Sequence, residues 1–207
     1  FATPVAPTPL PMPRLVHLNT ALAASLGIAS DAESRAALTA IVAGRVVPEG
    51  WTPVASAYAG HQFGVFVPQL GDGRALVLGT VADDAGADVE LQLKGSGPTP
   101  YSRGGDGRAV LRSTIREYLA SEAMHALGIP TTRALALVAS PAPVWRETEE
   151  QAATFVRTAP THVRFGTVEW LARHGDVPAM AALVDQLRPF FPELSHAGEL
   201  AARVTAL

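Results

Sequence analysis

The stretch VELQLKGSGPTPYSRGGDGRAVLRSTIREYL, residues 89–119, contains a strand pattern, a loop and the start of a helix in that order. Residues 89–94 alternate between apolar and polar side chains, which is typical of a strand with one face toward a core. Residues 95–107 are rich in Gly, Pro and Ser and predict a loop. Asp106 then stands where the N-cap of a helix is expected, and the helix is predicted over about 108–127.

Lys94, the last residue of the predicted strand, is the single lysine in the chain. The other fifteen of its 16 Lys and Arg residues are arginine. A lone lysine on the polar face of a strand is most often a solvated side chain, and that interpretation stays open. Lysine differs from arginine, however, because it is a compact point charge that often holds a phosphate group. Lys94 is therefore a candidate phosphate-binding residue.

The elements around this stretch predict an α+β fold, in which an antiparallel sheet with one long helix is followed by helices only. Strands are predicted over residues 64–70, 74–81, 131–140 and 151–158. We expect a hairpin between the first two through the Gly-Asp-Gly turn at 71–73, and pairing of 142–147 with the last strand. Helices are predicted over about 17–27, 31–43, 166–174, 176–188 and 195–206, with Asp31 as the cap of the second.

Composition and charge restrict the class of protein. Of the 207 residues, 48% are hydrophobic and 17% are charged, which is enough apolar material for a folded core. The formal net charge of −3 argues against a nucleic-acid partner. No apolar run reaches the roughly 18 residues of a membrane span, and no signal peptide is evident, so no membrane partner is expected. The absence of cysteine and the preference for arginine over lysine favour a cytoplasmic protein of a bacterium.

Glu117, on the predicted long helix, is a candidate partner for Lys94. Helical periodicity predicts one apolar stripe, made of Leu111, Ile115, Tyr118 and Leu119. Glu117 lies off that stripe, on the side of Val110 and Met124, so its carboxylate is expected to face a partly buried region where an ion partner is plausible. The alternative is a surface ion pair with Arg112 or Arg116 of the same helix.

Two glycine turns and two arginines are further candidates for an anion site. Consecutive backbone N–H groups in such turns can hold an anion, and a pair of arginines can clamp a phosphate. Each of these features is also common as an ordinary turn or a surface ion pair. The six histidines show no spacing typical of metal ligands. The candidates are Gly71, Gly73 and Arg74, then Asp106 and Gly107, and finally Arg157 and Arg164.

The order of a glycine-turn hairpin, a strand with a lysine and a helix with a glutamate is that of the N-lobe of a protein kinase. Four longer motifs extend this likeness: YAGHQFG (58–64), QLGDGRALVLG (69–79), the stretch from Glu90 to Leu135, and VRTAPTHVRFG (156–166). Together they closely resemble the SelO family. Its members have a kinase-like fold and transfer AMP from ATP to hydroxyl groups of Ser, Thr or Tyr in proteins.

The resemblance implies a role for each candidate. Lys94 is expected to hold the phosphates of ATP, and Glu117 is expected to position Lys94. The other residues implied in ATP binding are Gly71, Gly73, Arg74, Asp106, Gly107, Arg157 and Arg164. In this family ATP lies flipped relative to ordinary kinases, which directs the α-phosphate toward the acceptor protein.

The resemblance also implies what this chain lacks. The ligands of Mg²⁺ or Mn²⁺ and the catalytic base are expected in a C-lobe beyond residue 207. We therefore expect a truncated enzyme that is inactive alone. Residues 1–50 would be a Pro-rich extension with helices, 51–160 the N-lobe with the phosphate site, and 161–207 the start of the C-lobe. The alternatives are a conventional protein kinase and a non-catalytic, ATP-binding pseudokinase.

Overall fold

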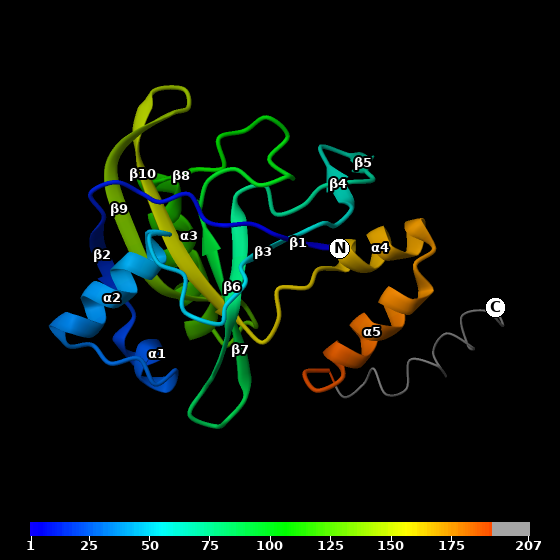
Figure 1. The fold of residues 1–207 in the computed structure, drawn as a ribbon, viewed down its shortest axis with the longest axis horizontal. Helices are drawn as coiled ribbons and strands as arrows, with labels where there is room; N and C mark the ends of the chain where they lie inside the picture. Colours follow the sequence, from blue (N-terminus) through cyan, green and yellow to red (C-terminus); the bar gives the residue numbers. More distant parts are fainter. Residues whose placement is uncertain (192–207) are drawn as a thin grey trace. The chain divides into compact units, whose positions relative to one another are not determined.

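The computed structural model describes residues 1–191 and divides the chain into two compact units (Figure 1). The first unit consists of residues 1–57 and 70–162, and the described part of the second consists of 58–69 and 163–191. Within the described residues the fold is α+β, with a mainly antiparallel sheet and five helices, as the sequence predicted.

The sheet of the first unit has the strand order β1-β3-β6-β7-β10-β9-β2, and β8 pairs with β10 beside this path. The pairings are antiparallel. The strands are β1 (Ala2–Pro4), β2 (Arg14–Leu18), β3 (Val54–Ser56), β6 (Ala75–Ala82), β7 (Asp88–Lys94), β8 (Ala109–Val110), β9 (Arg133–Trp145) and β10 (Glu149–Ala159). β9 and β10 form the predicted hairpin, in which Trp145 is opposite Glu149.

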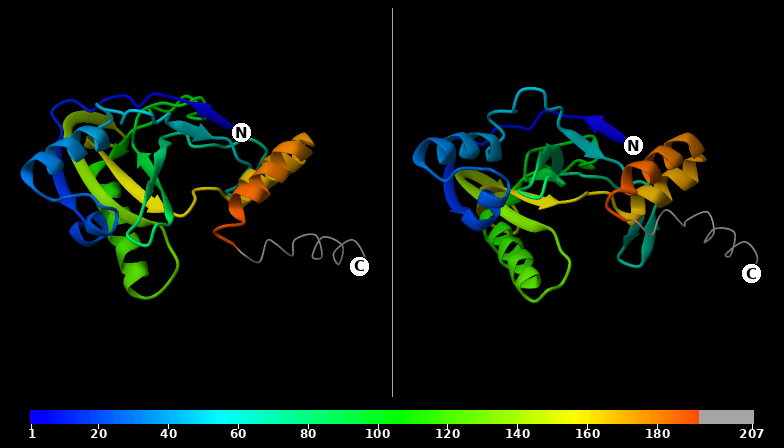
Figure 2. Two further views of the ribbon diagram at one scale, coloured as in Figure 1. Left: turned by 60° about the horizontal axis from the view of Figure 1, so that its bottom comes forward. Right: turned by 90° about the horizontal axis from the view of Figure 1, so that it is seen from below.

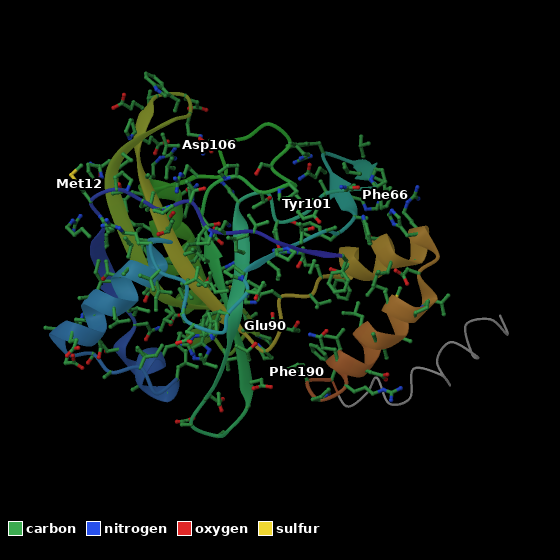
Figure 3. The ribbon with its side chains drawn as sticks, in the orientation of Figure 1. Met12, Phe66, Glu90, Tyr101, Asp106 and Phe190 are labelled. Atoms are coloured by element: carbon green, nitrogen blue, oxygen red, sulfur yellow. The ribbon has the colours of Figure 1, made fainter. Side chains whose placement is uncertain are left out.

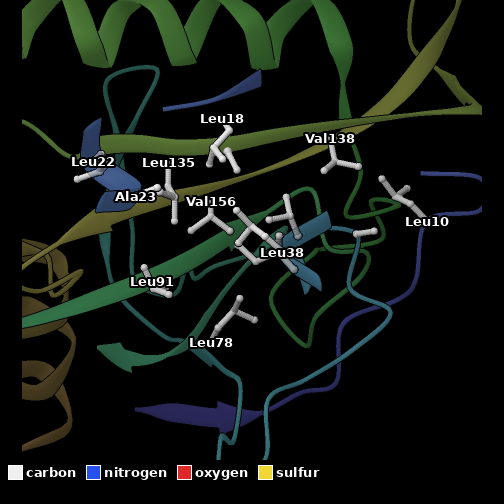
Figure 4. Close-up of a cluster of buried hydrophobic side chains, with 14 of the residues drawn as sticks. Leu10, Leu18, Leu22, Ala23, Leu38, Leu78, Leu91, Leu135, Val138 and Val156 are labelled. Carbon is white, nitrogen blue, oxygen red and sulfur yellow. The ribbon is translucent and has the colours of Figure 1, made fainter. Parts of the chain in front are cut away.

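Helices cover both faces of this sheet because its central strands are apolar on both sides. Along β9, Leu135 and Val138 join a large apolar cluster with α1 (Thr20–Ser25) and α2 (Ala32–Val42). Leu137 instead joins a second cluster with Tyr118 of α3 (Leu111–Ala126). Both views of Figure 2 show the strands between α2 and α3, and Figure 4 shows the larger cluster on the side away from α3.

Of the three helix starts predicted in this unit, one is confirmed and two are wrong. Asp31 caps α2 as expected. The helix expected from residue 17 begins only at Thr20, because His17 and Leu18 pair with β9 and Asn19 is the cap. Asp106 is not the cap of α3. The helix begins at Leu111, because Ala109 and Val110 first form β8 against β10.

The apolar stripe expected on α3 is confirmed for two of its four residues, because Tyr118 is buried and Leu111 packs against the same cluster. The other two are not buried: Leu119 is 62% exposed and Ile115 is 38% exposed. Beside Tyr118 the helix buries the polar Thr114 and Ser121. The small Thr114 can be buried because its hydroxyl donates to the carbonyl of Val110, 2.9 Å away.

The hairpin predicted across residues 71–73 does not form. β5 (Val65–Val67) pairs with β4 (Gly60–Gln62) in a separate sheet of the second unit, whereas β6 pairs with β3 and β7. The Gly-Asp-Gly segment is held by a buried aspartate instead. The carboxylate of Asp72 accepts a hydrogen bond from the N–H of Ser56, and Thr99 Oγ1 donates to the Asp72 carbonyl. These contacts make the segment a loop fastened to the first unit rather than a turn between paired strands.

The second unit contains α4 (Phe165–His174) and α5 (Val177–Leu187), close to the predicted ranges. Gly175 ends α4 in the left-handed conformation that favours glycine. The third predicted helix, 195–206, lies outside the described residues. Among residues 1–191, no helix has both the length and the apolar character needed to cross a membrane.

Glu122 fastens α3 to the sheet through four hydrogen bonds. Its carboxylate accepts from Asn19 Nδ2, from two nitrogens of Arg133 and from the backbone N–H of Ala134, at 2.8–3.0 Å. Burial alone would raise the pKa of Glu122, but these donors outweigh it and leave the pKa below its ordinary value.

We expect Glu122→Gln to lower the free energy of unfolding by about 2 kcal/mol at neutral pH, because the charged acceptor of four hydrogen bonds is lost. Glu122 has a lowered folded pKa, so its contribution is present above its unfolded pKa and disappears as pH falls through the folded one. The difference between wild type and variant in urea unfolding should therefore shrink in acid. Glu49→Gln, at an exposed position, is the control. A difference that is the same at pH 7 and in acid would contradict this role.

Candidate functional site

Lys94, Glu117 and Arg157 form an ion-pair cluster between the sheet and α3. Lys94 Nζ donates to both carboxylate oxygens of Glu117, at 2.8 and 2.5 Å. Arg157 Nη1 donates to the same carboxylate at 3.1 Å. The side chains of the two cations are only 17% and 14% exposed. The structure therefore forms the Lys94–Glu117 contact, and it adds Arg157 to the same carboxylate.

The strand register explains why these side chains meet. Leu91 and Leu93 point into the apolar cluster under α1 and α2, so Gln92 and Lys94 face the opposite side, toward α3. In the neighbouring strand β10, Arg157 stands opposite Gln92. Antiparallel pairing places directly opposed residues on the same face. Alternation along β7 thus directs Lys94 toward α3, and the pairing of β10 with β7 places Arg157 on the same face.

Gln92 is a member of this cluster that the sequence reasoning missed. It is fully buried, and its Oε1 accepts a hydrogen bond from Arg157 Nη2. One guanidinium nitrogen of Arg157 is thereby fixed by Gln92 and another by Glu117. The sequence feature that could have identified Gln92 is its position in the strand, two residues before Lys94 and on the same face. We interpret Gln92 as a residue that positions Arg157.

The electrostatics of the cluster favour an incoming anion. Burial lowers the pKa of Lys94, the hydrogen bonds from its ammonium to Glu117 oppose that shift, and the positive charges of Arg157 and Arg74 lower the pKa further. The net result is a pKa below the ordinary value of lysine. An anion bound beside Lys94 would relieve this repulsion among cations and stabilise the charged form of the ammonium.

A cavity of about 240 Å³ opens beside Lys94. It lies between the ends of the strands and α3, and it is lined by Arg74, Lys94, Ala109, Ser113, Thr114, Arg116, Glu117 and Ala120. Three of the lining side chains are cations and one is a carboxylate. The others are small. This lining suits a compact, highly charged anion better than an aromatic ring, which would need apolar walls.

The packing of Tyr101, which is labelled in Figure 3, requires glycine at positions 71 and 73. A Cβ at Gly71 would lie 2.4 Å from Cγ of Tyr101, and one at Gly73 would lie 2.8 Å from the Tyr101 carbonyl oxygen. The Tyr101 hydroxyl in turn forms a 2.8 Å hydrogen bond with Thr3 Oγ1. The fold itself therefore explains both glycines. Arg74, which follows them, is the residue of this turn that reaches the cavity.

Asp106 and Gly107 lie in the loop before β8 (Figure 3). Arg146 donates two hydrogen bonds to the Asp106 carboxylate, at 2.8 and 3.0 Å, and lowers the pKa of that group. Gly107 has a φ of 65°, and a Cβ there would lie 1.9 Å from the carbonyl oxygen of Gly97. The contacts of both residues thus hold the loop closed, while ATP binding by them stays a prediction.

Arg164 belongs to the second unit, unlike the other candidate residues. It precedes α4, and its guanidinium lies over the ring of Tyr58, 4.9 Å from the ring centre. Such a cation–π contact holds the guanidinium in place within its own unit.

The described residues do not fit a metal ion. Within 1–191 no group of three or more His, Asp or Glu side chains is arranged to hold one. The ligands of Mg²⁺ or Mn²⁺ expected beyond residue 207 stay a prediction.

Comparison with known proteins finds relatives of a single family. The family model described as "Protein adenylyltransferase SelO" matches residues 1–204. A protein nucleotidyltransferase YdiU of Methylococcus capsulatus is 59% identical over 195 residues, which cover 94% of this chain and 38% of that protein. A protein of the same name from Aeromonas salmonicida is 56% identical, over 97% of this chain and 42% of the relative. One from Rhizobium meliloti is 52% identical, over 94% and 40%. The chain thus spans about two fifths of the length of these curated relatives.

Proposed function

The chain belongs to the SelO family of protein nucleotidyltransferases, and on that premise we propose that it is the phosphate-binding N-terminal part of an enzyme that transfers AMP from ATP to protein hydroxyls. The observation that carries this proposal is the cation-lined cavity beside the Lys94–Glu117 pair. A nucleotidyltransferase class follows from the family, and the finer assignment to AMP rests on the placement of the cations.

AMP transfer needs positive charge on the outer phosphates. The acceptor oxygen forms a bond to the α-phosphorus, and the bond from that phosphorus to the bridging oxygen of the β-phosphate breaks. Pyrophosphate leaves with the electron pair, so negative charge grows on the β- and γ-phosphates. In our proposal Lys94 and Arg74 hold those phosphates in the cavity, with Arg157 adding charge behind them. The proton of the acceptor hydroxyl goes to a base outside the described residues.

The arrangement of elements also supports a kinase-like N-lobe. In protein kinases a strand lysine pairs with a glutamate of the helix that packs on the sheet, and the lysine contacts the nucleotide phosphates. β7 and α3 follow one another in this order, and Lys94 pairs with Glu117 of the helix, which supports the proposal. This likeness keeps two alternatives in view, a phosphoryl-transferring kinase and a non-catalytic ATP-binding protein.

Labelled ATP distinguishes the three functions. We expect the full-length protein to place label from the α-phosphate of ATP on protein, and none from the γ-phosphate, because the γ-phosphate leaves within pyrophosphate. Label from the γ-phosphate alone would show a kinase. ATP binding without any transfer would show a non-catalytic protein. The 207-residue chain alone should transfer nothing, and transfer by it would contradict the proposed missing half.

A further inference from the structure

We infer that Arg116 is a further phosphate-contacting residue of this cavity and binds the polyphosphate end of the nucleotide, an inference that rests on the proposed function. Arg116 is exposed and lines the cavity together with Lys94 and Arg74. It was considered above only as an alternative ion-pair partner of Glu117. In the structure that carboxylate is taken by Lys94 and Arg157 instead.

Arg116 differs from Arg112 in making neither a hydrogen bond nor an ion pair among the described residues, although its charge also acts on Glu150. One turn earlier on α3, Arg112 donates two hydrogen bonds to Glu150, at 2.9 and 3.1 Å. Arg133 and Arg146 likewise pair with carboxylates. For Arg116, the described part of the chain provides neither a hydrogen bond nor an ion pair. Its five N–H donors remain available to a ligand in the cavity.

The excess of positive charge around the cavity also favours the binding of a polyphosphate. Arg74 and Arg116 line the cavity without an ion-pair partner among the residues described, and Lys94 shares the single carboxylate of Glu117 with Arg157. Three cations therefore line the cavity beside one carboxylate, and Arg157 adds a fourth positive charge at that carboxylate. Glu150, on which the charge of Arg116 also acts, is already paired with Arg112. A triphosphate supplies several negative charges in a compact chain and would neutralise this excess, whereas a single carboxylate or a neutral base would not.

The face of α3 that borders the cavity offers Arg116 as a donor to a triphosphate. Ser113, Arg116 and Ala120 lie at intervals of three and four residues, so they share one face of the helix. The hydroxyl of Ser113 already donates to the carbonyl of Val110, which leaves Arg116 as the long donor on this face. Its planar guanidinium can contact two phosphate oxygens at once, a geometry that lysine lacks.

The test compares Arg116→Gln with Arg112→Gln in the full-length protein, because both arginines are exposed on the same helix and only Arg116 lines the cavity. Calorimetry would measure the binding of ATP, inorganic tripolyphosphate and adenosine. We expect Arg116→Gln to weaken ATP and tripolyphosphate about tenfold, the size of one exposed charge-assisted contact, and to leave adenosine unchanged. Arg112→Gln should stay within about twofold of wild type, and Arg116→Lys should recover part of the loss.

The outcomes separate this inference from the proposed function. If Arg116→Gln binds tripolyphosphate as tightly as wild type while Lys94→Ala does not, Arg116 is a solvated surface residue and the phosphate site stands. If Lys94→Ala also binds ATP and tripolyphosphate as wild type does, the cavity is not the phosphate site and both ideas fail. If Arg112→Gln weakened the binding of ATP and tripolyphosphate as much as Arg116→Gln does, the effect would be one of general surface charge, and the inference would be overturned.

Discussion

Replacing Lys94 by alanine in the full-length protein is expected to lower AMP transfer by about 10²–10³-fold, the loss typical of removing one group that stabilises charge in a transition state. Lys94 is the most buried cation bordering the cavity, and its ammonium lies 2.5 Å from Glu117. In the proposed mechanism the leaving pyrophosphate would then lose a positive charge, and Glu117 loses one of its two cations. Initial rates with α-labelled ATP measure the effect.

Lys94→Arg is the sharper form of this experiment because it keeps the charge. The side chain of Lys94 is 17% exposed and makes two contacts with one carboxylate. A planar guanidinium is larger, and it would have to share this space with Arg157. We therefore expect most of the activity to be lost in this variant too, with an unchanged unfolding midpoint. Wild-type rates in Lys94→Arg would show that Lys94 supplies charge but no specific geometry.

The strand that carries Lys94 could be predicted from sequence because its pattern is local. Alternation along residues 89–94 is enough to place Leu91 and Leu93 in the core and Lys94 on the other face. The cap of α2 at Asp31 is local in the same way. The contact between Lys94 and Glu117 is different, because it was predicted from the kinase-like order of strand, loop and helix, with Arg112 and Arg116 as alternative partners of Glu117. The strand and the cap alone needed no knowledge of distant contacts.

Other parts depended on contacts between segments far apart in the chain. The Gly-Asp-Gly segment at 71–73 has the composition of a hairpin turn, but Asp72 is buried against Ser56 and the loop at 99–102 packs over the glycines. No local pattern contains that information. The same is true of α3, where tertiary packing buries the polar Thr114 and leaves Leu119 exposed.

The residues that complete the site were hidden for a related reason. Gln92 is unremarkable in a strand until β10 places Arg157 opposite it. Arg116 becomes distinctive only by comparison with arginines whose carboxylate partners are fixed by the fold, as Glu150 is for Arg112. In both cases the informative fact is which partner a side chain has, and that fact follows from strand pairing and helix packing rather than from residue type.

Glu117→Gln is expected to reduce AMP transfer about 100-fold at neutral pH, because Lys94 and Arg157 would lose the group that holds them, and misplacement by about 1 Å can cost that much. The variant also removes the negative charge that sustains the ammonium. Burial already lowers the pKa of Lys94, and the hydrogen bonds to Glu117 oppose that shift. Without the carboxylate the pKa must fall further.

This lowering of the Lys94 pKa should change the pH dependence of ATP binding in one direction. Binding that needs charged Lys94 weakens as pH rises through the lysine pKa, so the alkaline fall in affinity should move to lower pH in Glu117→Gln. Glu117→Asp, which keeps the charge, should move it less. Glu150→Gln removes a carboxylate that pairs with Arg112 outside the cavity, and it should leave the profile unchanged. If the alkaline fall stayed in place in Glu117→Gln while affinity dropped at every pH, Glu117 would position Lys94 without controlling its charge.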